Sequence, residues 1–153
     1  MPQFLVENSD LIIRLFLALF LGMIIGAERL FVHKDAGMKT HAMVATGSAL
    51  FVIISELVAF RYGMSEGFDP TRIASQIIVG VGFLGAGSIM LQGSRVRGLA
   101  TAGGLWATAG VGMAAGFGFN ALAVISAVMI LFIFVVVNYL EEPIRRISSD
   151  SDQ

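Results

Sequence analysis

Three polar side chains interrupt long apolar runs of this sequence: Arg14, Glu56 and Gln76. Each lies about one helical turn from the same end of its run, so the three are expected at similar depth. A bilayer penalises such groups unless they are paired or face a cavity. Two interpretations are open: Arg14 extends to the headgroups and Glu56 is a paired structural carboxylate, or these residues serve transport or sensing.

A second set of polar residues gathers at the opposite ends of the runs, where one run stops and the next begins. Mixed charges at a membrane boundary are typical of headgroup contacts and topology signals, and this interpretation stands beside a functional one. The set consists of Glu28, Arg29, Lys39, Thr40, His41, Arg95, Arg97 and Thr101.

Motifs for catalysis or for metal and nucleotide binding are missing from the sequence. It has no Walker A loop, no GxSxG elbow and no HExxH pair. A GxGxxG string from Gly80 to Gly85 lies inside an apolar run rather than after a strand, so it does not indicate a dinucleotide site. His33 and His41 have no carboxylate cluster at metal-ligand spacing. We therefore expect neither an enzyme nor a metal or cofactor site.

The amino-acid composition indicates whether the protein is soluble or lies in a membrane. Of 153 residues, 56% are hydrophobic and only 14% charged, and the mean hydropathy is +0.83, which leaves too little polar material for the surface of a soluble domain. The sequence thus predicts an integral membrane protein. The net charge of −1 gives no electrostatic reason to expect nucleic acid as a partner.

Five apolar runs have about the 20 residues that a helix needs to cross a bilayer. We expect an all-α bundle of five transmembrane helices in one domain, residues 1–140, followed by a short cytoplasmic tail, residues 141–153. The start of the chain lacks a positive n-region, so the first run is interpreted as a retained anchor. The spans are expected at about 11–27, 42–60, 73–91, 98–119 and 121–140.

Lysine and arginine are divided unequally between the two sides of such a bundle. One side has only Arg61 and Arg72, and the positive-inside rule therefore places the N-terminus outside and the C-terminus in the cytoplasm. The cytoplasmic side would carry Arg29, Lys34, Lys39, Arg95, Arg97, Arg145 and Arg146.

Small residues recur at helical spacing in the first and fourth runs, and the third run is rich in glycine. Such stripes let helices approach closely, either within one chain or at a homodimer seam. Trp106, near the middle of the fourth run, is expected to pack inside the bundle rather than at an interface. These small residues are Ala18, Gly22 and Gly26 in the first run, Gly80, Gly82, Gly85 and Gly87 in the third, and Ala100, Gly104, Thr108, Gly112 and Gly116 in the fourth.

Four segments together resemble the MgtC/SapB family of membrane proteins. They are GAER at 26–29, AGMKTHAMVATGSALF at 36–51, IASQIIVGVGFLGAGSIM at 73–90 and VRGLATAGGLWATAGVGMAAGFG at 96–118. The likeness covers nearly the whole chain from the first run to the fourth, in order. Departures occur at Met38-Lys39, where leucine and arginine are frequent, and at Ala100 and Gly103-Gly104, where threonine, alanine and serine are common.

The resemblance implies a multi-pass protein of the bacterial inner membrane, linked to growth under magnesium limitation and to virulence through survival inside host cells. Some members restrain the F-type ATP synthase, so a regulatory or adaptor role is expected, with membrane lipid, a second copy or a membrane protein such as that synthase as partner. The alternative is a small ion or solute transporter or channel that uses the intramembrane polar residues. Many members also carry an ACT-like domain after the membrane part, which is not expected in this sequence.

Overall fold

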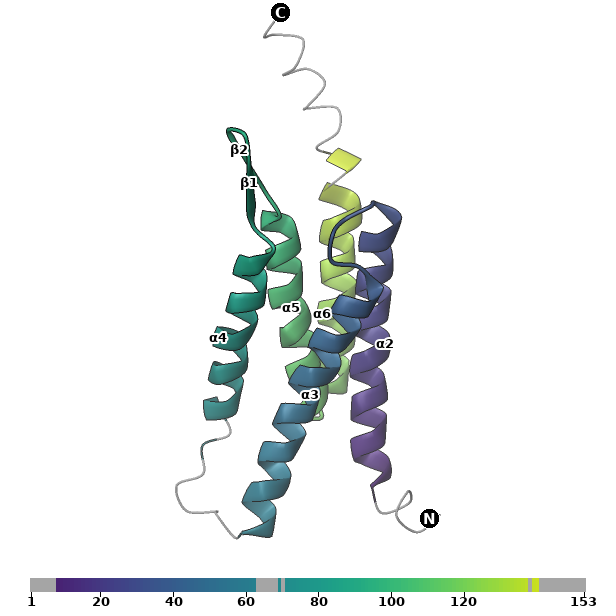
Figure 1. Ribbon diagram of the computed structural model, residues 1–153. Helices are drawn as coiled ribbons and strands as arrows, with labels where there is room; N and C mark the ends of the chain where they lie inside the picture. The colour runs from purple at the N-terminus through teal and green to yellow at the C-terminus, as the bar shows by residue number, and fades with distance from the viewer. Residues whose placement is uncertain (1–7, 63–68, 70, 138, 141–153) are drawn as a thin grey trace, which may run out of the picture.

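The computed structural model describes residues 8–62, 69, 71–137 and 139–140, and the described part is almost entirely helical (Figure 1). The predicted tail at 141–153, with Arg145 and Arg146, lies outside the described residues. In chain order the elements are α2 Ser9–Phe31, α3 Met38–Arg61, α4 Thr71–Gly87, β1 Met90–Gln92, β2 Arg95–Arg97, α5 Leu99–Gly116, α6 Asn120–Phe132 and the π-helix η1 Ile133–Val137.

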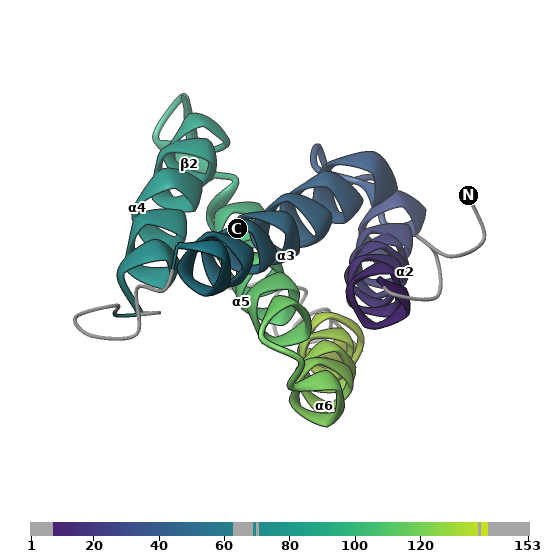
Figure 2. The ribbon, with the colours of Figure 1, turned by 90° about the horizontal axis from the view of Figure 1, so that it is seen from below.

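The helices form a bundle with α5 at its centre. α5 contacts α2, α3, α4 and α6, whereas α4 contacts α5 far more than α3. Seen from below, α3 and α5 lie in the middle, with α4 to one side and α2 and α6 to the other (Figure 2). α4 therefore lies at the edge of the described bundle, with α5 as its main neighbour.

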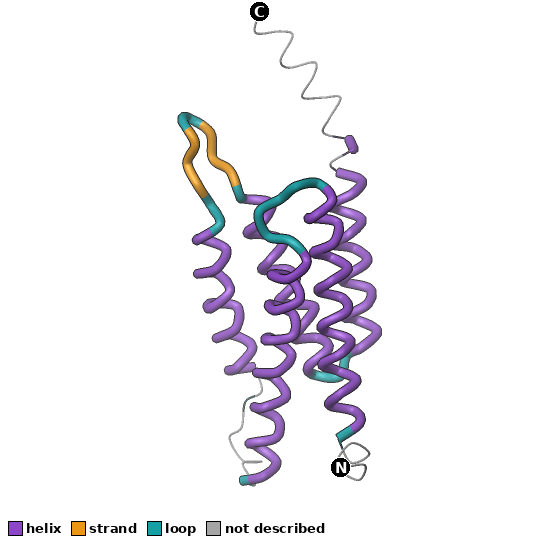
Figure 3. The backbone as a smooth tube through the Cα atoms, turned by 45° about the vertical axis from the view of Figure 1, so that its right-hand side comes forward, coloured by secondary structure: helices purple, strands orange, loops and turns teal. Residues whose placement is uncertain are grey.

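The two ends of the bundle differ in what they carry. The end that we call the hairpin end holds the β1–β2 hairpin, the α2–α3 connection and η1 (Figure 3). The other, the Arg14 end, holds the start of α2, the end of α3 and the α5–α6 turn. At this end the carboxylate of Asp69 caps α4, because the backbone N–H and the hydroxyl of Thr71 donate to its Oδ1 at 2.8 and 2.6 Å. These two bonds hold the pKa of the Asp69 carboxyl below its usual value.

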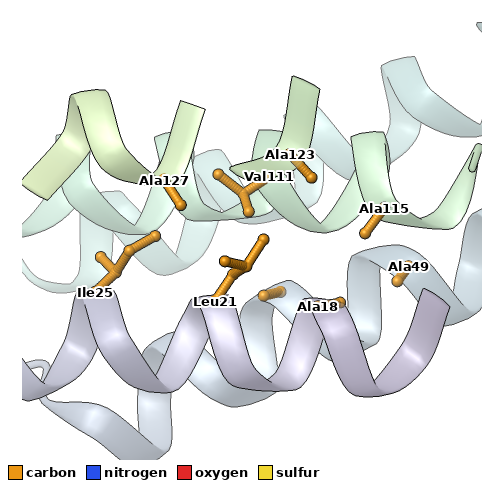
Figure 4. Packing of buried hydrophobic residues seen from close by; sticks show 9 residues of the cluster. Ala18, Leu21, Ile25, Ala49, Val111, Ala115, Ala123 and Ala127 are labelled. Atoms are coloured by element: carbon orange, nitrogen blue, oxygen red, sulfur yellow. The ribbon is translucent and has the colours of Figure 1, made fainter. Parts of the chain in front are cut away.

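Backbone-to-backbone contact replaces large side chains in the middle of the bundle. A Cβ on Gly112 would lie 2.1 Å from the carbonyl oxygen of Ala45, and one on Gly22 would lie 2.6 Å from that of His41. Such approach is possible only because these positions lack side chains. The cluster that surrounds them is rich in alanine (Figure 4) and contains Ala18, Leu21, Ile25, Ala45, Ala49, Val111, Ala115, Ala123 and Ala127.

The two predicted small-residue stripes pack as expected. In α5 all members are buried except Ala100, which is exposed, and Gly116 lies against Ala49 and Val52 of α3. In α2, Gly26 is as tightly packed as Gly22, since a Cβ there would lie 2.6 Å from the Cα of Met38. The close approach of α2, α3 and α5 thus follows from the spacing of glycine and alanine in the sequence.

The glycine-rich third run does not pack in this way within one chain. Positions 80, 82 and 87 face open space, with no atom within 4 Å of a built Cβ, and Gly85 makes only ordinary contact with Ala102 at 3.5 Å. The prediction that Gly80, Gly82 and Gly87 bring helices together is therefore wrong for the single chain. Trp106 is 54% exposed, so the prediction that it packs inside was also wrong.

Element boundaries differ from the predicted spans mainly at the hairpin end. The third run was predicted to be helical to residue 91, but α4 ends at Gly87, where the hydroxyl of Ser88 donates to the carbonyl of Gly85 at 2.7 Å. The residues that follow form the hairpin. Three segments are long and apolar enough to cross a membrane, namely α2, α3 and Asn120–Val137, while α4 is a shorter apolar helix.

Candidate functional site

At the Arg14 end, Arg14 connects three elements. Its Nη2 lies 2.6 Å from Oδ2 of Asp10, one turn earlier in α2, and its Nη1 lies 2.9 Å from Oε2 of Glu56 in α3. The same Nη1 donates to the backbone carbonyl of Gly116 at 3.1 Å, which ties α2 to the end of α5. Arg14 and Glu56, which the sequence places at similar depth, therefore form an ion pair, and Asp10 and the carbonyl of Gly116 join it.

The surroundings of this pair are asymmetric. The side chain of Arg14 is 15% exposed, whereas those of Asp10 and Glu56 are 65% and 55% exposed. Gly118, with a φ of 79°, covers the guanidinium so closely that a Cβ there would lie 3.1 Å from Cζ of Arg14. The cation is thus held under the α5–α6 turn while both carboxylates stay accessible.

Gln76 does not join this group. It is exposed on α4, and within the described part of the chain it hydrogen-bonds to neither Arg14 nor Glu56. It lines instead an apolar groove of about 530 Å³ between α3 and α4, together with Thr40 from the second predicted layer. Similar depth in the sequence did not bring Gln76 to the pair because α4 lies at the edge of the bundle.

At the hairpin end, Arg29 is buried to an unusual degree for an arginine. It is 1% exposed, its Nε donates to the carboxylate of the adjacent Glu28, and its Cζ lies 3.6 Å from the ring centroid of Phe134. A carboxylate and an aromatic face are the two kinds of partner that compensate a desolvated guanidinium. One of its nitrogens, Nη2, has no hydrogen-bond partner among the described residues.

His41 of α3 is buried in the same region, at 0% exposure. Its Nδ1 lies 3.0 Å from the carbonyl oxygen of Gly37; since a carbonyl only accepts, this assignment puts the proton on Nδ1 and leaves Nε2 as an acceptor. Nε2 likewise has no partner in the described chain. Gly104 of α5 adjoins both groups, because a Cβ there would lie 2.7 Å from Cζ of Phe134 and 3.5 Å from Nε2 of His41.

These two nitrogens define what this buried site can bind. Nη2 of Arg29 is a donor, and Nε2 of His41 is an acceptor in the neutral ring, so each could be satisfied by a small polar molecule such as water. A dication is disfavoured beside a buried guanidinium. The described residues contain no group of three or more His, Cys, Asp or Glu side chains that could hold a metal ion.

The second predicted layer therefore divides in two. Glu28, Arg29, His41 and Thr101 are at least partly buried, Thr101 lying one turn before Gly104 on α5. The remaining basic residues, Lys39, Arg95 and Arg97, are exposed, and Thr40 lies in the groove.

Phe134 is the residue of this site that the sequence did not indicate. It belongs to η1, a π-helical stretch that continues α6. Such stretches change which residues face the bundle and are frequent at functional sites. A phenylalanine within an apolar run gives no signal of an arginine beneath it, so no pattern in the sequence could have singled it out.

Comparison with known proteins decides the family. The model of the MgtC family matches residues 15–143, a stretch that begins one residue after Arg14 and includes Glu56 and the buried site at the hairpin end. The chain belongs to the MgtC family. No solved structure matches it.

Several curated proteins are similar over most of this chain. "Putative magnesium transporter YhiD" of Escherichia coli K12 is 40% identical over 140 residues, which cover 87% of this chain and 63% of YhiD. Protein MgtC of Brucella abortus strain 2308 is 44% identical over 130 residues (85% of this chain, 50% of that protein). Protein MgtC of Salmonella typhimurium LT2 is 46% identical over 121 residues (78% and 49%). The chain thus spans about half the length of the MgtC proteins that it matches.

Proposed function

We propose that this MgtC-family membrane protein is a non-enzymatic regulatory or adaptor protein of the bacterial inner membrane, which acts without a cofactor. Its role would be adaptation to magnesium limitation and control of membrane energetics. In this proposal all five helices cross the membrane, with the N-terminus outside and the hairpin end in the cytoplasm. A reporter fused after Arg97 should then give a cytoplasmic signal.

The close-packed centre of the bundle is the observation that carries this proposal. The charged side chains lie at the two ends, and between them α2, α3 and α5 meet through glycine and alanine with backbone-to-backbone contact. The buried polar residues of this middle stretch are Ser48 and Thr108, whose side chains are small hydroxyls, and Thr108 donates to the carbonyl of Gly104 in its own helix. A transporter needs polar groups or a broken helix near the middle of the membrane. Such a tightly packed middle favours a bundle that presents surfaces to a partner over one that conducts.

The partner class follows from where the chain leaves apolar surface uncovered. Phe83 is 81% exposed and Val79 68% exposed on α4, and the glycines around them face open space. A second copy or another membrane protein would meet this face of α4. The family resemblance makes the F-type ATP synthase the first candidate for such a partner.

A paired measurement tests this proposal. The purified protein should give no magnesium or proton flux above that of empty liposomes, and in inverted membrane vesicles it should lower proton pumping driven by the F-type ATP synthase. The Phe83→Ala variant should lose the second effect, whereas Phe31→Ala, equally exposed on α2, should keep it. Specific flux that Glu56→Gln abolishes would overturn the regulatory proposal.

A transporter or channel is the second candidate, and the buried site favours it. Two unpaired polar nitrogens at 1% and 0% residue exposure are costly unless they serve binding. Because Arg29 is a cation, the species bound there would be water or an anion rather than magnesium. Chloride or phosphate flux that is lost in Arg29→Gln would support this candidate against the first.

A further inference from the structure

The β1–β2 hairpin is a defined element rather than a loose turn. Its register pairs Met90 with Arg97, Leu91 with Val96 and Gln92 with Arg95. Gly98 closes its base with a φ of 89°, where a Cβ would lie 1.9 Å from the carbonyl oxygen of Ser88. Only glycine fits this position, so the hairpin is fixed to the ends of α4 and α5.

The hairpin has two chemically different faces. Residues opposite each other in an antiparallel pair share a face, and neighbours along a strand point to opposite faces. Leu91 and Val96 therefore form one face, and they are 74% and 52% exposed. Arg95 and Arg97 lie on the other face, also exposed. An element this small leaves neither face covered by the rest of the described chain.

The positive charge of this hairpin is not neutralised within the described chain. The sequence has no aspartate or glutamate between Asp69 and Glu141. None of the ion pairs in the described residues involves Arg95 or Arg97. Among the described residues, both guanidinium groups are therefore available to an anion from outside the chain.

In the five-span topology proposed above, on which this step rests, helix length places the hairpin at the level of the lipid headgroups. α4 has 17 residues and α5 has 18, so they are about 26 and 27 Å long, slightly less than the ~30 Å hydrocarbon core. The boundary of the core then falls at the base of the hairpin. Each strand of 3 residues rises about 10 Å, similar to the headgroup layer of about 5 to 8 Å on each side.

We propose that the hairpin is a binding site for anionic phospholipid headgroups. Arg95 and Arg97 hold the phosphate oxygens through charge-assisted hydrogen bonds, and Leu91 and Val96 lie against the glycerol and upper acyl region. A soluble acidic protein is the other partner with matching charge, but a stable protein interface buries about 800 Å² per partner, more than two three-residue strands offer. The proposal does not depend on which protein the chain regulates.

A single label on the hairpin tests this site. The chain has no cysteine, so Ser94→Cys carries a unique environment-sensitive fluorophore at the hairpin turn. The protein is reconstituted in nanodiscs of phosphatidylcholine with a rising fraction of phosphatidylglycerol. We expect the label to move to a less polar environment as that fraction rises, and high salt to reverse the change.

Charge variants decide whether the arginines cause this response. Arg95→Gln with Arg97→Gln should raise the phosphatidylglycerol fraction for half-maximal response about fivefold or more, since each arginine near a membrane surface contributes a factor of about five. The double lysine variant should respond like the parent, which also shows that the hairpin tolerates substitution. The matched control, Arg61→Gln with Arg72→Gln at the Arg14 end, removes the same charge and should leave the response unchanged.

Two outcomes would overturn the proposal. One is that the fluorescence of the label in the parent protein does not change with phosphatidylglycerol. A label that responds to a soluble acidic protein but not to phosphatidylglycerol counts as this outcome. The other is a double glutamine variant that keeps the lipid response of the parent while its helical content and thermal stability are intact.

Discussion

Replacing Gly112 by alanine tests whether the close backbone contact between α3 and α5 at this glycine stabilises the bundle. A methyl group there would lie 2.1 Å from the carbonyl oxygen of Ala45 and 2.8 Å from its Cα, so it meets backbone rather than a movable side chain. The matched control is Gly110→Ala, two residues earlier in α5, where a Cβ meets nothing within 4 Å. Both variants add one methyl group to the same helix.

The expected cost follows from the contact. To restore ordinary packing, α3 and α5 must separate by about 1 Å, and overpacking of this kind costs about 1–3 kcal/mol. The strain extends to α2, because a Cβ on Gly22 would already lie 2.9 Å from Cβ of Ala45. Gly110→Ala should instead be neutral or stabilising, since alanine is up to about 1 kcal/mol better than glycine in a helix. The two variants should therefore differ in their free energy of unfolding by about 1–4 kcal/mol.

Unfolding in mixed detergent, followed by circular dichroism and by the fluorescence of Trp106, measures this difference. The midpoint should fall for Gly112→Ala and stay or rise for Gly110→Ala. Equal midpoints for the two variants would refute the inference that α3 and α5 touch through their backbones.

Three further predictions concern the polar ends. Arg14→Gln should destabilise the protein more than Glu56→Gln, because Arg14 also binds the carboxylate of Asp10 and the carbonyl of Gly116. A double-mutant cycle should give a coupling energy below about 1 kcal/mol between Arg14 and Glu56, since the Glu56 carboxylate is half exposed. Phe134→Leu should cost about 1–2 kcal/mol through loss of its contact with the buried guanidinium, while Phe132→Leu, 62% exposed, should change the unfolding midpoint little. The cap of α4 should weaken in acid, because the pKa of the Asp69 carboxyl is lower in the folded protein than its ordinary value of 3.8. The stability that this carboxylate contributes is complete above pH 3.8 and is lost as the pH falls through the lower folded-state pKa. Hydrogen exchange at the start of α4 should therefore accelerate in acid, and Asp69→Asn should remove that dependence.

The positions of the helices and their close packing could be predicted because both depend on short-range patterns in the sequence. Apolar length marks the helices, and small residues every four positions mark the α5 face that meets α3. Glycine content misled in α4, since a glycine-rich helix can be approached closely without having a neighbour at those positions. Gly80, for example, faces open space, and only tertiary contacts could reveal it.

The candidate site could be predicted where its residues lie at similar depth in the membrane and on helices that pack against each other. Arg14 and Glu56 met this condition, whereas Gln76 shared their depth on a helix that packs at the periphery. The contact of Phe134 with Arg29 could not be predicted, because a π-helix depends on how backbone hydrogen bonds shift and not on a residue pattern. The hairpin was missed for a related reason, as Ile89 to Leu91 are apolar enough to extend the preceding span.

The close contacts among α2, α3 and α5 and the burial of the Arg29 guanidinium are consequences of the same packing. Gly26 lets α2 approach the start of α3, and Gly104 brings α5 beside His41 and Phe134. These approaches enclose Arg29, which follows Gly26 by less than one turn, and so remove its guanidinium from solvent. A buried cation is costly unless it is paired, which explains why Glu28 and the Phe134 ring lie against it. Widening the bundle at Gly104 would therefore hydrate Arg29 as well as loosen the helices, so that packing and polar chemistry at the hairpin end must change together.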